Sequence, residues 1–175
     1  MHTLFMSLWN YTGSGRPDFA VEPGPGQESV WDYPRPPALV DDARLVEVFD
    51  GDQRIASTRA ALRVLETASP PTFYLPPESL DADALQVVGG ASFCEWKGAA
   101  RYWALAGQAE PVGWSYPSPS SAFIRLRDYV GFYPGRLRCF VDGERVRPQP
   151  GGFYGGWITD EIVGPVKGEP GTGHW

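Results

Sequence analysis

A thiol and an amine lie close together near the middle of this 175-residue sequence. Cys94 and Lys97 are separated by two residues, in a segment that also holds Trp96 and Tyr102. A nearby ammonium group stabilises a thiolate and lowers the thiol pKa, which would make Cys94 a nucleophile. An isolated cysteine is also a common buried apolar residue, and a single lysine is commonly a solvated charge. The spacing therefore predicts either a catalytic pair of Cys94 and Lys97 or an ordinary structural segment.

Aromatic residues recur on both sides of this segment, several of them beside polar groups. Pockets for small molecules combine ring surfaces with a few convergent polar side chains. These residues therefore predict an aromatic cleft between sheets, with Glu66 and Lys97 as its floor, that binds a small planar or polar ligand. The expected ligand-binding residues are Glu66, Tyr74, Tyr102, Trp114, Tyr116 and Tyr133. The same rings would equally serve as ordinary core.

Several other chemistries are disfavoured by residue type. The only histidines are His2 and His174, so no internal imidazole is available for a Ser-His or Cys-His pair. Two isolated cysteines and two terminal histidines also fall short of a zinc site, and we expect neither a metal nor a cofactor. The segments 13–15 and 164–168 are similar to phosphate-binding loops. Neither follows a strand and opens a helix, so both are interpreted as flexible loops.

Charge and hydropathy restrict the possible partners. The net charge is −6, and the arginines are scattered among acids instead of forming a basic patch, which disfavours binding to nucleic acid. No apolar run is long enough to cross a bilayer, and residues 1–10 lack the basic and apolar regions of a signal peptide. We therefore expect a cytoplasmic protein without membrane contact.

Short strands separated by turn residues dominate the predicted secondary structure. Asp50-Gly51-Asp52 predicts a hairpin between strands at 44–50 and 53–58, and Asp142-Gly143 predicts a second hairpin. Further strands are expected at 72–75, 85–88, 99–105, 111–116, 129–133 and 137–141, the last two joined by a turn at Pro134-Gly135. Helix is expected only at 60–67 and 118–128.

Glycine and proline, with 21 and 18 residues, concentrate toward the two ends of the chain. We therefore predict a single core domain at 44–147, flanked by an N-terminal arm at 1–43 and a C-terminal arm at 148–175. Rings in the arms, such as Trp31 and Trp157, are expected to pin the arms to the core by burial. The aromatic, proline-rich arms are alternatively a surface for a partner protein.

The string Cys94-x-x-Lys97-Gly98-x-Ala100-x-Tyr102 resembles a motif of the bacterial family known as domain of unknown function 427. Segments 28–37, 63–66, 114–117 and 132–134 also resemble members of this family. The resemblance implies a β-tent fold, in which two roughly orthogonal antiparallel sheets meet, as in methionine sulfoxide reductase B and the ligand-binding domain of cereblon. Those relatives commonly hold zinc through four cysteines, which this sequence lacks.

The resemblance leaves the activity open. Cereblon-like domains bind cyclic imides in an aromatic cage, and the reductases use a thiol beside aromatic rings. Both analogies fit Cys94, Trp114 and Tyr116, but a shared fold does not transfer function. Some family members carry a nucleotidyltransferase label, an activity that requires paired carboxylates for magnesium shortly after a Gly-Gly turn. After Gly89-Gly90, Glu95 is the only acid before residue 106, so we disfavour that activity.

Overall fold

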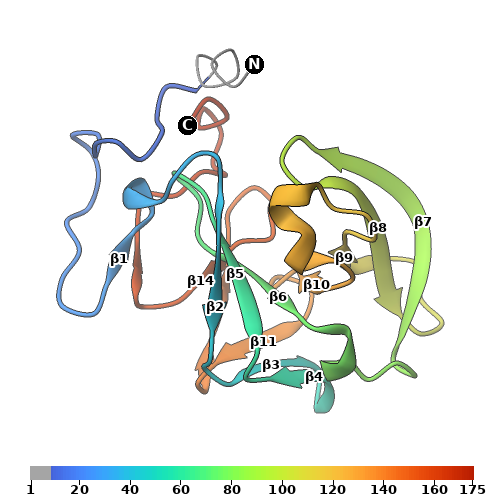
Figure 1. Cartoon of the computed structure of the whole chain (residues 1–175). Coiled ribbons are helices and arrows are strands. Elements are labelled where there is room, and N and C mark those ends of the chain that lie inside the picture. The colour runs from blue at the N-terminus through green and yellow to red at the C-terminus, as the bar shows by residue number, and fades with distance from the viewer. Residues whose placement is uncertain (1–8) are drawn as a thin grey trace.

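The computed structural model describes residues 9–175 and is built almost entirely from β-strands (Figure 1). Most strands belong to two antiparallel sheets, one of seven strands and one of four. In Figure 1, β3 (Val46–Asp50) and β4 (Gln53–Thr58) of the smaller sheet run across the lower end of β2 (Ala38–Asp42) and β5 (Ala61–Leu65) of the larger sheet. The predicted fold class, mainly β with antiparallel sheets and little helix, is confirmed.

The two sheets differ in size and in how their strands follow one another along the chain. The larger sheet has the order β2 (Ala38–Asp42), β5 (Ala61–Leu65), β6 (Thr72–Leu75), β10 (Val130–Phe132), β9 (Pro111–Ser115), β8 (Gly98–Leu105) and β7 (Leu85–Cys94). The smaller sheet has the order β12 (Glu144–Arg145), β11 (Arg138–Val141), β3 (Val46–Asp50) and β4 (Gln53–Thr58). The hairpin predicted at Asp50-Gly51-Asp52 is confirmed, because β3 and β4 are paired around it.

Short elements complete the chain. Two strand pairs lie outside the larger sheets, β1 (Glu28–Ser29) with β15 (Ile162–Val163) and β13 (Arg147–Pro148) with β14 (Trp157–Ile158). The helical turns are η2 (Val30–Asp32), η3 (Pro77–Ser79) and η4 (Ser121–Leu126). In residues 9–175, none of these turns has the length and apolarity of a membrane-spanning helix.

The main core lies between the seven-stranded sheet and the four-stranded sheet. Val48 and Ile55 of the smaller sheet belong to the same buried cluster as Phe73 and Phe132 of the larger sheet. Trp157 of the C-terminal arm completes this cluster. Its ring stacks on Phe73 with 4.8 Å between centroids, and its Nε1 donates a hydrogen bond to the main-chain oxygen of Phe132 at 3.0 Å. The core therefore depends on an arm residue as well as on the two sheets.

The arms pack against the rest of the molecule through aromatic rings. Trp31 and Trp157 have no exposed surface, and Tyr33 is also buried, so the prediction that rings pin the arms is confirmed for these residues. Phe153 differs, because 77% of its surface is exposed. Residues 38–42, which were predicted to belong to the N-terminal arm, form β2 at one edge of the larger sheet. Residues 1–8 of that arm lie outside the described part of the chain.

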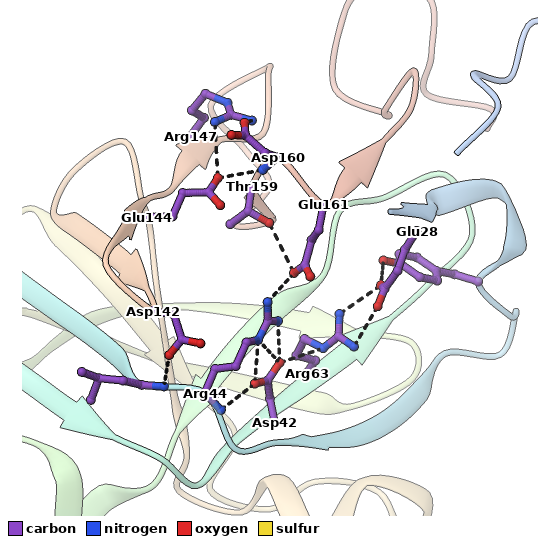
Figure 2. Close-up of polar contacts among 12 residues, drawn as sticks. Glu28, Asp42, Arg44, Arg63, Asp142, Glu144, Arg147, Thr159, Asp160 and Glu161 are labelled. Carbon is purple, nitrogen blue, oxygen red and sulfur yellow. Dashed lines mark hydrogen bonds and ion pairs between the residues drawn. The ribbon is translucent and has the colours of Figure 1, made fainter. Parts of the chain in front are cut away.

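Ion pairs join both arms to the edge of the larger sheet (Figure 2). Arg44, just after β2, pairs with Asp42 and with Glu161 of the C-terminal arm, each at 2.7 Å. Arg63 of β5 pairs with Asp42 at 3.3 Å and with Glu28 of β1 at 3.1 Å. The Asp42 side chain is only 6% exposed, so salt screens its ion pairs less than it screens surface pairs.

The helix predicted at 60–67 is wrong, because residues 61–65 form β5. Apolar residues at 61, 62, 64 and 65 fit one face of a helix, but they also fit a strand that is buried on both faces. β5 lies inside the larger sheet between β2 and β6, and there Ala61, Leu62 and Val64 are buried. The sheet neighbours therefore decide the conformation of this segment.

Two other predicted features also differ from the structure. The helix expected at 118–128 is reduced to η4, whose Phe123 has the non-helical dihedral angles φ −118° and ψ 21°. The turn at Pro134-Gly135 does not join a hairpin, because β10 pairs with β6 and β9 whereas β11 pairs with β3 and β12. The chain crosses from the larger sheet to the smaller one at this turn.

Candidate functional site

One cavity of about 580 Å³ lies against the larger sheet, between the turn that joins β7 to β8 and the C-terminal arm. All eight residues predicted from the sequence as catalytic or ligand-binding line it. They are Glu66, Tyr74, Cys94, Lys97, Tyr102, Trp114, Tyr116 and Tyr133. The structure thus brings the predicted site residues together, whereas their roles in binding or catalysis stay predictions.

Strand register explains why the rings share one wall. Tyr74 on β6 stands beside Gly131 on β10, which stands beside Trp114 on β9, which in turn stands beside Tyr102 on β8. Residues in register across neighbouring strands point to the same face of a sheet. Gly131 leaves the space that the Trp114 ring fills, because a Cβ atom there would stand 2.7 Å from Cζ2 of the indole.

The wall carries polar groups among its rings. Trp114 Nε1 donates a hydrogen bond to the Tyr74 hydroxyl at 3.2 Å, and the rings of Trp114 and Tyr133 lie 4.7 Å apart. Burial raises the pKa of Tyr74, of Tyr116 and of Tyr133 above the ordinary value of a tyrosine. These hydroxyls therefore stay protonated at neutral pH and are able to donate hydrogen bonds to a ligand.

Glu66 marks a charged end of the cavity. Its Oε1 accepts a hydrogen bond from Trp96 Nε1 at 2.8 Å and lies 3.9 Å from Nε of Arg35. The Arg35 side chain is 2% exposed and donates to the main-chain oxygens of Tyr11 and Thr67 at 2.8 and 2.9 Å. Burial lowers the pKa of Arg35, opposed by the negative charges of Glu66 and Glu95. This buried guanidinium lies behind Glu66 and does not itself line the cavity.

Cys94 and Lys97 lie at the tip of the hairpin formed by β7 and β8. Cys94 is the last residue of β7, is half-buried and pairs across the hairpin with Gly98. Lys97 Nζ lies 5.8 Å from the ring centre of Tyr116 and 5.9 Å from that of Phe123. The thiol therefore faces the cavity, and the amine lies over aromatic rings.

The C-terminal arm adds residues to the cavity wall that were not predicted from the sequence. Among them, Lys167 is 7% exposed and Gln149 is 4% exposed. Gln149 Nε2 donates to the main-chain oxygen of Lys167 at 2.7 Å, and its Oε1 accepts from the main-chain nitrogen of Gly156 at 3.1 Å. Tyr154 also lines the cavity, and its ring centre lies 5.6 Å from Lys167 Nζ. The segment 164–168, interpreted as a flexible loop, thus contributes a buried amine.

Aromatic side chains form a large part of the cavity lining. Ten of the residues around the cavity are aromatic: Trp9, Tyr74, Phe93, Trp96, Tyr102, Trp114, Tyr116, Tyr133, Phe153 and Tyr154. Within residues 9–175, no three histidine, cysteine or acidic side chains are grouped so that they could hold a metal ion. Aromatic walls with a few charged groups are typical of pockets for small molecules.

Comparison with known proteins places most of the chain in one family. A family model described as a domain of unknown function (DUF427) matches residues 38–146. No curated protein matches the chain. The matched range contains all eight residues that were selected from the sequence, whereas Gln149, Tyr154 and Lys167 of the arm lie beyond it.

Proposed function

The chain belongs to the DUF427 family, and we propose that it binds a small organic molecule in the aromatic cavity. One observation carries this proposal. Side chains from β6, β8, β9 and the turn after β7 converge with the C-terminal arm on a single cavity of about 580 Å³. Pockets for small molecules commonly have volumes of about 300 to 1,000 Å³.

The lining also supports binding through its polar groups. The hydroxyl of Tyr74, the carboxylate of Glu66 and the amine of Lys97 are spread among the rings. Rings supply contact area, while a few directional polar groups fix the orientation of a ligand. A core made only for stability would leave fewer charged groups beside an open space, because unpaired charge is costly to bury.

Thermal unfolding in the presence of a metabolite panel tests this proposal. A compound at about 100 times its Kd should add roughly 2.7 kcal/mol to the free energy of unfolding. We expect Lys97→Ala and Trp114→Ala to remove the stabilisation by such a compound, and Arg101→Ala, on the exposed part of β8, to retain it. If no compound of the panel stabilises the wild-type protein, or if Lys97→Ala is stabilised as much as the wild-type protein, binding in this cavity is contradicted.

A second candidate function is thiol chemistry at Cys94. It is supported by the position of Cys94, which is a free, half-buried cysteine in the cavity wall. The rate of alkylation against pH separates the two functions. A midpoint well below the ordinary thiol pKa of about 8.5 would favour a nucleophilic role, and an unreactive thiol would exclude that role.

A further inference from the structure

Three hydrogen-bond donors lie close together in the aromatic wall of the cavity. Trp114 Nε1 donates to the Tyr74 hydroxyl at 3.2 Å, and the ring centres of Tyr74 and Tyr116 lie 6.3 Å apart. All three residues line the cavity, and Tyr74 and Tyr116 are 2% and 6% exposed. Burial raises the pKa of both hydroxyls, so each keeps its proton at neutral pH. This part of the wall therefore offers three protons for hydrogen bonds.

These donors have too few acceptors among themselves. An indole N–H group only donates, so the acceptors in the set are the two hydroxyl oxygens. A chain of hydrogen bonds that starts at Trp114 and runs through both hydroxyls uses two of the three protons. In residues 9–175, the tyrosine hydroxyls that make hydrogen bonds are those of Tyr33, Tyr74 and Tyr102, and none of these bonds takes the third proton. One donor of the set is therefore left for a ligand.

The Tyr116 hydroxyl is the end of this set that reaches open space. In residues 9–175, the fully buried side-chain nitrogen and oxygen atoms without a partner are Trp31 Nε1, Arg35 Nε and Arg63 Nε. The Tyr116 oxygen makes no hydrogen bond in this part of the chain and is not one of these atoms, so it is not fully buried. Because Tyr116 lines the cavity, its hydroxyl is the donor that a bound molecule meets.

Most charged groups around the cavity already have partners. Arg136 pairs with Glu110 at 3.6 Å, and Lys167 Nζ lies 3.5 Å from an oxygen of Trp175, the last residue. Glu66 accepts a hydrogen bond and faces a buried guanidinium, as described above. A charged ligand would have to compete with these contacts.

The two other charged groups of the lining are Lys97 and Glu95. Lys97 is half-buried over aromatic rings, and Glu95 is exposed. Neither is a fully buried charge, so neither requires a counterion from a ligand. A charged ligand would lose its own hydration for little gain, whereas an uncharged ligand avoids this cost.

We propose that the cavity binds an uncharged planar aromatic molecule that carries a hydrogen-bond acceptor, and that this acceptor binds the hydroxyl of Tyr116. The ring of the ligand packs against Trp114 and Tyr133, whose ring centres lie 4.7 Å apart. A ligand without an acceptor would leave one donor of the wall buried and unpaired. This inference rests on the proposed function, because it names the class of molecule that the same cavity takes.

Fluorine NMR titration of the full chain with four matched probes tests the inference. The probes are the neutral ketone 4-fluoroacetophenone, the hydrocarbon 1-ethyl-4-fluorobenzene, the anion 4-fluorobenzoate and the cation 4-fluorobenzylamine. The hydrocarbon has nearly the shape of the ketone but has no acceptor. We expect the ketone to bind about tenfold or more tightly than each of the other three, because only the ketone pairs the free donor without bringing a charge.

One variant and one control assign the effect to Tyr116. In Tyr116→Phe the preference for the ketone over the hydrocarbon should disappear, because the ring stays and the donor is removed. Tyr129→Phe also removes a tyrosine hydroxyl, but Tyr129 lies outside the cavity, so this variant should keep the wild-type preference. The comparison of ketone and hydrocarbon in the wild-type protein is decisive even if Tyr116→Phe fails to fold.

Four results would overturn the inference. Equal or tighter binding of the hydrocarbon would show that the cavity does not recognise an acceptor, and the proposed function would stand. Tightest binding of the benzoate or the benzylamine would show that the ligand is charged, and the proposed function would again stand. An undiminished preference for the ketone in Tyr116→Phe would exclude the proposed donor. Absence of binding by all four probes would overturn the class of ligand, while the metabolite panel decides separately whether the cavity binds any molecule.

Discussion

Gly155 of the C-terminal arm packs against the indole ring of Trp114, so closely that a Cβ atom at residue 155 would stand 2.1 Å from Cη2. Real Cβ atoms do not approach another heavy atom to this distance. Trp114 forms part of the cavity wall, and Gly155 lies beyond the range that the family model matches. The C-terminal arm and the Trp114 ring of the cavity wall are therefore in direct contact.

Gly155→Ala should destabilise the protein by about 1 to 3 kcal/mol, because an added methyl group must displace either the arm or the ring of Trp114. Gly173→Ala, in open space on the same arm, is the matched control and should change the stability little. Urea denaturation measures both effects. Equal stability of the two variants would mean that the arm yields without cost.

The hydrogen bond between Trp114 and Tyr74 supplies a second prediction. The Tyr74 side chain is buried, and its hydroxyl accepts from Trp114 Nε1 at 3.2 Å. Tyr74→Phe leaves this indole donor without its partner, so we expect a loss of about 1 to 2 kcal/mol in the free energy of unfolding. Tyr129→Phe, at a half-buried ring outside the cavity, should cost less. A smaller loss for Tyr74→Phe than for Tyr129→Phe would contradict the prediction.

The sheet half of the candidate site is accessible to sequence reasoning, and the arm half is not. Tyr74, Tyr102 and Trp114 lie on strands whose lengths and turns are visible in the sequence, and cross-strand register then places them on one face. No periodic pattern relates Lys167 or Gln149 to that face. Their positions follow from contacts of the folded arm, such as the bond from Gln149 to the Lys167 main chain.

Some strand pairings of the fold follow from local turn residues, and others depend on contacts between segments that are distant in the sequence. The hairpin of β3 and β4 is predictable, because Gly51 in its turn adopts a positive φ of 56°. The pairing of β11 with β3 is not, because Pro134-Gly135 has the composition of a hairpin turn and yet joins two different sheets. The residues of a turn determine that the chain changes direction there. The packing of the two sheets determines in which sheet the next strand pairs.

Asp42 gives a prediction that depends on pH. Burial alone would raise the pKa of Asp42, but hydrogen bonds and positive charge from Arg44 and Arg63 outweigh it and hold the pKa below its ordinary value. The stability from this depressed pKa is present above the pKa of the unfolded chain, about 3.9, and is lost as the pH falls through the folded pKa.

Asp42→Asn should therefore lower the free energy of unfolding by about 3 kcal/mol at pH 7, because it leaves two arginines short of a largely buried partner. The difference from the wild-type protein should narrow as the pH falls below about 4. Urea denaturation at pH 7 and between pH 5 and pH 2 measures this. Asp52→Asn, at a fully exposed side chain, is the control. A gap that stays constant with pH would show that charge is not the cause.

The two cysteines should differ widely in reactivity. Cys139 has no exposed surface, and burial raises the pKa of its thiol, whereas Cys94 is half-buried in the cavity wall. At pH 8 we expect iodoacetamide to modify Cys94 on the order of a hundredfold faster than Cys139, which reacts only when the core opens. Peptide mass spectrometry over time measures both rates, and Cys94→Ser should abolish the fast reaction. Similar alkylation rates for Cys94 and Cys139 would contradict the prediction that burial protects Cys139.

The amine of Lys167 should lower the stability of the protein at neutral pH. Burial, followed by the positive charge of Arg35, lowers the pKa of Lys167, although Glu66 and Glu95 oppose this. The folded state therefore binds this proton more weakly than the unfolded chain does. Stability should rise with pH from the folded pKa up to the unfolded value of about 10.4, since the unfolded chain then holds more protons.

Lys167→Met keeps the length of the side chain and removes the charge, so it should not reduce the free energy of unfolding at pH 7 and is expected to increase it. This is the opposite of what removal of a well-paired buried group does, because the one hydrogen bond of Lys167 Nζ, to an oxygen of the last residue, Trp175, is long at 3.5 Å. The gain should shrink as the pH approaches about 10, where the wild-type amine loses its proton. Urea denaturation of both proteins between pH 7 and pH 10 measures the gap. A loss of stability in Lys167→Met that is independent of pH would instead assign Lys167 a structural role in holding the arm.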